Sequence, residues 1–110
     1  MKLIEIGTKK YVIEFNSNVI FNINKNGITY KKLAESFGED MDIQGLYTAF
    51  YYSLKKHHDF TIEEALEVID EYFANGNDIE DFAKLVLGEW AEAMGFGKQF
   101  RKAMKKEAKK

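Results

Sequence analysis

The chain has 110 residues, enough for one hydrophobic core, and its 45% apolar and 31% charged residues exclude a disordered chain. It contains no cysteine, which excludes disulfide bonds, thiolate nucleophiles and cysteine-ligated metals. Because residues 1–97 carry a net charge of −8 and residues 98–110 a net charge of +6, we expect a single globular domain over residues 1–97 followed by a basic tail over residues 98–110.

Two segments near the start alternate between apolar and polar positions. Lys2–Ile6 places Ile4 and Ile6 on one face, and Tyr11–Phe15 alternates in the same way. A period of two predicts strands, and Gly7 between them can take a positive φ, so we expect an antiparallel β-hairpin. Helices must cover it, because a lone hairpin is only marginally stable.

The next stretch, residues 16–26, contains five asparagines and fits neither the helical nor the strand period cleanly. We predict a short helix here, with a strand as the alternative. Ser17 or Asn18 is the expected N-cap, and Asn26-Gly27 supplies the left-handed stop. A second short helix is predicted from Tyr30 to Phe37, before Gly38.

Two longer helices follow. The first begins after Asp42 and ends in Lys55, Lys56, His57 and His58, which suit the negative end of a helix dipole. Its apolar face consists of Ile43, Leu46, Tyr47, Phe50, Tyr51 and Leu54. The second begins with a capping box in which Thr61 and Glu64 bond each other's backbone N–H groups, and Asn75-Gly76 ends it.

The last main helix runs from Ile79 to about Met94, with Asn77 or Asp78 as its cap. Its apolar positions spread over roughly 200° of the circumference, which is wide for a surface helix. Either it is the central helix, packed on two sides, or part of its face is left for a partner or another copy. The fold class is therefore α+β and mainly helical, with an N-terminal antiparallel hairpin followed by four to five helices.

The wide helix and the tail supply the candidate partner-binding residues. They are Leu87, Trp90, Met94, Phe96, Phe100 and Met104. For Trp90 the alternative is core packing, so Leu87 and Met94 are the preferred exposed candidates. Phe100 and Met104 lie four residues apart, so the tail is expected either to form an amphipathic helix or to be disordered until bound.

The residue pattern offers no catalytic, cofactor or metal site. His57 and His58 are adjacent and lack the i, i+4 spacing that lets two imidazoles share a metal. A carboxylate stripe, Glu63, Glu67, Asp70 and Glu71, is expected on the outer side of its helix, as a solvated face or a docking surface for a basic partner. No Gly-rich phosphate loop and no Ser/His/Asp order is present. We therefore expect a protein that is not an enzyme.

The order and spacing of several segments resemble phage tail assembly chaperones. These segments are Met1–Gly7, Tyr11–Asn16, the short stretch that closes at Gly27, Leu46–Lys55, and the helix start Thr61–Ala65. The resemblance covers about residues 2–96 and concerns a family from long-tailed phages and prophages of Gram-positive bacteria. The asparagine-rich stretch departs from that family's more acidic, helix-favouring sequence.

This resemblance implies a non-catalytic chaperone that binds the long, apolar tape-measure protein and keeps it soluble while the tail is assembled. It also implies self-association into a homo-oligomer and contact with other tail proteins. The chain shows neither a signal-peptide hydrophobic region nor an apolar run long enough to cross a bilayer, so we expect it in the host cytoplasm, without a membrane partner. The alternative is a small nucleic-acid-associated regulator that uses the basic tail, although the acidic body disfavours nucleic acid.

Overall fold

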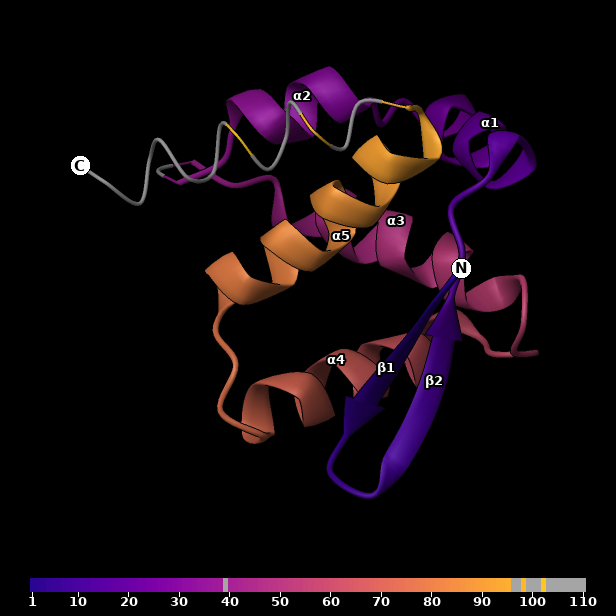
Figure 1. Cartoon of the computed structure of the whole chain (residues 1–110), viewed down its shortest axis with the longest axis vertical. Coiled ribbons are helices and arrows are strands. Elements are labelled where there is room, and N and C mark those ends of the chain that lie inside the picture. The colour runs from indigo at the N-terminus through magenta and orange to yellow at the C-terminus, as the bar shows by residue number, and fades with distance from the viewer. Residues whose placement is uncertain (39, 96–97, 99–101, 103–110) are drawn as a thin grey trace.

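The chain begins with strands β1 (Lys2–Ile6) and β2 (Lys9–Ile13), which pair antiparallel and place Ile4 opposite Tyr11. Gly7, at φ +62°, makes the tight connection possible, as the sequence predicts. The structure is a computed structural model (Figure 1) and describes residues 1–38, 40–95, 98 and 102. The predicted α+β class is confirmed: the hairpin precedes five helices in the described part of the chain.

One face of the hairpin belongs to the core, and one of its edges is covered. The alternation predicted for this face holds, because Ile4, Ile6, Tyr11 and Ile13 are all buried. The outer edge of β2 is covered by two bonds from the strand's end: Val12 N–H donates to His58 Nε2 at 2.9 Å, and Glu14 N–H donates to the Ser53 carbonyl at 3.0 Å. The hairpin is thereby fixed to the third helix and to the loop that follows it.

Two short helices come next, α1 (Ser17–Lys25) and α2 (Tyr30–Glu35). The prediction of a helix over the asparagine-rich stretch is confirmed, and Gly27, at φ +80°, follows its end. The predicted cap was wrong: Asn16, rather than Ser17 or Asn18, caps α1 by accepting the Val19 N–H at 2.9 Å. Asn16 still has extended backbone, so it is the last residue before the helix and takes the capping role.

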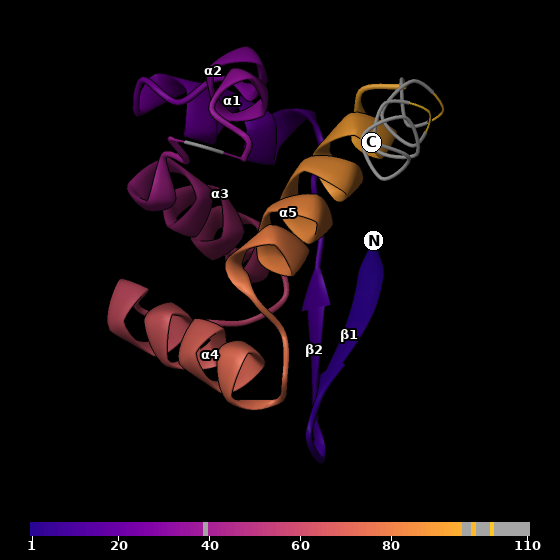
Figure 2. The same ribbon diagram turned by 90° about the vertical axis from the view of Figure 1, so that its left-hand side faces the viewer.

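Three longer helices complete the fold: α3 (Ile43–Lys55), α4 (Ile62–Ala74) and α5 (Ile79–Ala93). The capping box of Thr61 and Glu64 is confirmed, and Asp78 and Asp81 form a second reciprocal pair at the start of α5. Helix α3 packs against β2, α1, α4 and α5, which makes it the centre of the arrangement. Figure 2 shows α3 between α1 and α2 on one side and α4 on the other, with α5 crossing beside it.

Most of the wide apolar face of α5 is covered by the chain itself. Its buried residues are Phe82, Ala83, Val86, Leu87, Trp90 and Ala91. The helix packs against α3 near its start, where the Phe50 and Phe82 rings lie 5.1 Å apart, and against α2 along another side. The helix is packed on two sides, although the central position belongs to α3, and Met94 at its end stays exposed.

Candidate partner-binding surface

The partner-binding residues predicted on α5 differ in exposure. Met94 is 39% exposed, whereas Leu87 is 1% exposed and Trp90 is fully buried. The expectation that Leu87 is exposed was therefore wrong. Leu87 lies one helical turn from Ala83 and Ala91, which are both buried, so the stripe that the chain covers is wider than the sequence suggested.

Trp90 is a core anchor, as the alternative interpretation proposed. Its indole stacks on Phe15 with the ring centroids 5.8 Å apart and meets the edge of Tyr30 at 5.7 Å. It therefore joins the end of the hairpin to α2 and α5. Three further predicted binding residues, Phe96, Phe100 and Met104, lie outside the described residues and stay predictions.

The two adjacent histidines are used to hold the hairpin. His58 accepts the Val12 N–H and stacks on Phe60, with the ring centroids 4.9 Å apart. His57 Nε2 lies 2.7 Å from Glu14 Oε1, and this hydrogen bond, together with one from Asn16, lowers the pKa of Glu14. Within the described part of the chain, no group of three His, Asp or Glu side chains is placed to hold a metal ion.

The carboxylate stripe of α4 is only partly on the outer side. Glu63, Glu67 and Asp70 are exposed, but Glu71 is half-buried against the hairpin. Its carboxylate accepts hydrogen bonds from Lys9 Nζ at 3.1 Å and from the Tyr11 hydroxyl at 3.3 Å. The bond with Glu71 raises the pKa of Lys9. The prediction of an outward position was therefore wrong for Glu71, because the hairpin packs against that side of the helix.

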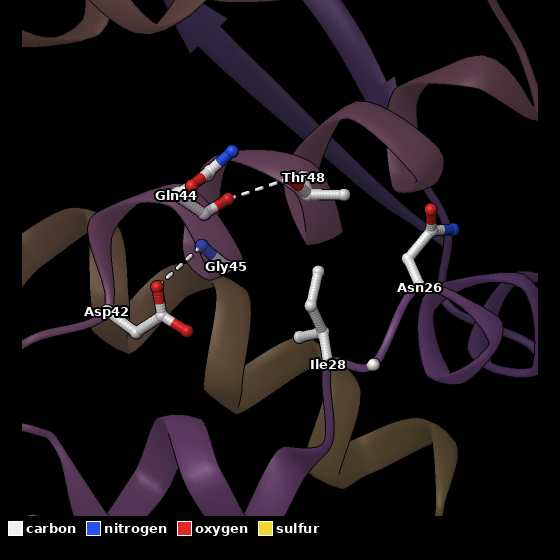
Figure 3. Close-up of a pocket in the computed structure, with 7 residues that line it drawn as sticks. Asn26, Ile28, Asp42, Gln44, Gly45 and Thr48 are labelled. Atoms are coloured by element: carbon white, nitrogen blue, oxygen red, sulfur yellow. Dashed lines mark hydrogen bonds between the residues drawn. The ribbon is translucent and has the colours of Figure 1, made fainter.

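One hollow of about 360 Å³ lies between the end of α1 and the start of α3 (Figure 3). Its polar groups already bond to the chain: the Asp42 carboxylate accepts the Gly45 N–H at 3.0 Å, and the Thr48 hydroxyl donates to the Gln44 carbonyl at 2.7 Å. The Asn26 amide donates to the Asn22 carbonyl and to the Tyr52 hydroxyl. These groups serve helix capping and packing, so we assign no ligand to this hollow.

A second hollow, of about 310 Å³, lies where the starts of α3 and α5 approach each other, and its residues define what we call the acidic hollow. They are Gly38, Asp40, Met41, Ile43, Ile79 and Glu80. Ile43 is 38% exposed, and Met41 and Ile79 are half-buried. The lining of the hollow thus contains both partly exposed apolar side chains and two exposed carboxylates, Asp40 and Glu80.

Further carboxylates stand near this hollow at the caps of the two helices. Asp42 caps α3, and Asp78 and Asp81 form the reciprocal cap of α5. The Asp81 backbone N–H donates to Asp78 and lowers its pKa, so the Asp78 side chain is charged at neutral pH. None of the described residues that line the hollow is basic. The surface therefore combines apolar contact with a negative rim.

The acidic hollow was not predicted from the sequence. Ile43 and Ile79 are the first residues of their helices, and each follows an aspartate cap, so each looked like the start of an ordinary buried face. The signal that could have marked them is this repeated pattern of an acidic cap followed by isoleucine. Nothing in the sequence shows that the two helix starts lie together.

Comparisons with known proteins identify no relative: no family model, curated protein or solved structure matches the chain. Among the described residues, no helix has both the length and the apolar content that crossing a membrane requires. The family resemblance therefore stays a prediction from the sequence.

Proposed function

We propose that the chain is a non-catalytic chaperone of phage tail assembly that binds the tape-measure protein in the host cytoplasm and keeps it soluble. The observation that carries the proposal is the order and spacing of the family-like segments, from Met1–Gly7 to Thr61–Ala65. Support comes from their placement: the first segment contains β1, the second contains the end of β2 and the Asn16 cap of α1, and the last two lie on α3 and at the start of α4.

The surface of α4 has the chemistry that such a role requires. Ile62 and Leu66 lie one turn apart and are 38% and 37% exposed, and we call them the Ile62 and Leu66 ridge. An exposed glutamate follows each of them in the chain, Glu63 after Ile62 and Glu67 after Leu66. An apolar contact surface flanked by charge can cover an apolar helical client while the complex stays in solution. We assign the first contact with the client to this ridge, together with the exposed Met94 at the end of α5. Self-association and contact with other tail proteins belong to the same proposal.

Co-expression tests the proposal. A tape-measure protein from the same source genome is produced with the chain, with the Ile62→Lys/Leu66→Lys variant, or alone, and its soluble fraction is measured. We expect the wild-type chain to raise the soluble fraction and to co-purify with the client at moderate salt, and the variant to do neither. Equal solubility in all three samples would refute the proposal.

A second function is favoured by one feature, the basic segment 98–110, in which Lys98 and Lys102 are exposed. Such a segment suits phosphate contacts, so the second candidate is a nucleic-acid-associated regulator. It predicts binding to duplex DNA that falls steeply with salt and is lost when Lys98, Lys102, Lys105 and Lys106 are changed to glutamine. The chaperone proposal predicts no such binding at moderate salt.

A further inference from the structure

We propose that the acidic hollow is the docking site for the basic segment 98–110 of a second copy of the chain. This proposal names the surface through which the chain self-associates. It rests on the proposed function only for the expectation that the chain self-associates. The binding of a client is measured separately, on the Ile62 and Leu66 ridge, so each can fail without the other.

The two surfaces are complementary in charge and in apolar content. The hollow offers the apolar Met41, Ile43 and Ile79 together with the carboxylates of Asp40 and Glu80. The segment offers two large apolar residues, Phe100 and Met104, among seven basic residues and a single acidic one. Phe100 and Met104 can contact the apolar residues of the hollow while the basic side chains around them attract its carboxylates. The apolar and the charged contacts then stabilise the same complex.

The length of the chain favours a second copy over the chain's own segment. Ile79, in the hollow, and Gly95, just after α5, are separated by sixteen residues of mostly helical chain, which at 1.5 Å per residue places them about 24 Å apart. Phe100 comes five residues after Gly95, so full extension carries its Cα at most about 18 Å away. In the amphipathic helix that the sequence predicts for this segment, Phe100 and Met104 lie only about 8 Å and 14 Å beyond Gly95, so neither reaches the hollow of its own chain and a second copy is the expected source.

The geometry of this contact is head to tail, because the hollow of one copy receives the segment of the next. Such a contact repeats along a chain of copies unless it closes into a ring. We therefore expect a mass that rises with concentration beyond that of a dimer, from a monomer of 12.8 kDa. High salt is expected to lower this mass, since it screens the charges at the rim.

The fold provides matched control positions for the test. Ile43 and Ile62 are each the first residue of a helix, and both are 38% exposed, but only Ile43 lines the hollow. Glu80 and Glu63 are each the second residue of a helix, and only Glu80 lines the hollow. Substitutions at Ile62 and Glu63 thus repeat the local change away from the proposed site.

The experiment measures mass by sedimentation velocity on the full chain. We expect Ile43→Lys/Glu80→Lys, the hollow variant, and Phe100→Ser/Met104→Ser, the segment variant, to be monomeric. The control Ile62→Lys/Glu63→Lys is expected to associate like the wild type. An equimolar mixture of the hollow variant and the segment variant is expected to form dimers and nothing larger, because the mixture retains one intact hollow and one intact segment.

A synthetic peptide of residues 98–110 gives the second measurement, by fluorescence polarisation against the segment variant. Binding is expected to weaken by about tenfold or more when Ile43→Lys is added and by less than about twofold when Ile62→Lys is added. A wild-type chain that stays monomeric, a mixture that forms no dimer, or equal effects of the two lysines would overturn the proposal. Duplex DNA binding by the segment, with self-association unchanged in the segment variant, would also overturn it and favour the regulator.

Discussion

Replacing Gly45 by alanine tests how tightly the start of α3 is packed. Loose packing would let alanine raise the free energy of unfolding, whereas tight packing would make alanine lower it. Gly45 is buried in the first turn of α3, and its backbone N–H donates to the Asp42 cap (Figure 3). A Cβ placed on Gly45 would lie 2.6 Å from Asp42 Oδ2 and 2.8 Å from Leu33 Cδ2. Both distances are shorter than real contacts, so both side chains must move when Gly45 is changed to alanine.

The expected magnitude follows from three contributions. Alanine in place of glycine inside a helix stabilises by about 1 kcal/mol. Displacing the Asp42 cap costs about 1 kcal/mol, and moving Leu33 away from its rotamer costs about 1 kcal/mol more. We therefore expect Gly45→Ala to lower the free energy of unfolding by about 1 kcal/mol, the difference between these contributions.

Urea unfolding followed by the fluorescence of the single tryptophan, Trp90, measures this change. The Asp42→Ala variant serves as the control. With the cap already removed, Gly45→Ala is expected to be less destabilising by about 1 kcal/mol than in the wild type. A stabilisation by Gly45→Ala in the wild type would show that neither side chain is displaced, and effects of the two substitutions that simply add would show that the Asp42 cap stays in place.

Three further predictions concern the core and the hairpin. Leu87→Ala should lower the free energy of unfolding by about 2–4 kcal/mol, because Leu87 is 1% exposed; a loss below about 1 kcal/mol in urea unfolding would mean that Leu87 is accessible. His58→Ala should cost about 1–2 kcal/mol by leaving the Val12 N–H without its acceptor, whereas equal stability would contradict the covered edge. Since the pKa of Glu14 is lowered in the fold, the ionised carboxylate contributes stability at neutral pH, and this contribution is lost as the carboxylate is protonated in acid. Glu14→Gln should therefore lose less stability than the wild type as the pH falls from 6 to 3. Identical dependence of stability on pH in the two proteins would contradict this.

Elements whose signals are local were predictable from the sequence. The hairpin followed from its alternation and from Gly7, and the start of α4 followed from Thr61 and Glu64, because each signal lies within a few residues of the structure it specifies. The asparagine-rich stretch, whose residues fit neither period cleanly, forms the predicted helix because Asn16 caps it and Val19 and Ile23, four apart, are buried on one face.

Features that depend on distant packing were not predictable. Glu71 bonds with Lys9 and Tyr11, about sixty residues earlier, and the pattern of α4 alone cannot show this. Leu87 lies on a stripe that α5 buries only because the helix packs on two sides. The acidic hollow likewise exists because the starts of α3 and α5 meet, and this meeting is a property of the whole fold.

The most direct test of the chaperone account is the aggregation of a tape-measure fragment, followed by light scattering after dilution from denaturant. With a molar excess of the chain present, we expect the scattering to stay near the baseline. We also expect Ile62→Lys/Leu66→Lys to protect far less than the wild type. Aggregation at the same rate with and without the chain, or equal protection by the variant, would contradict the account.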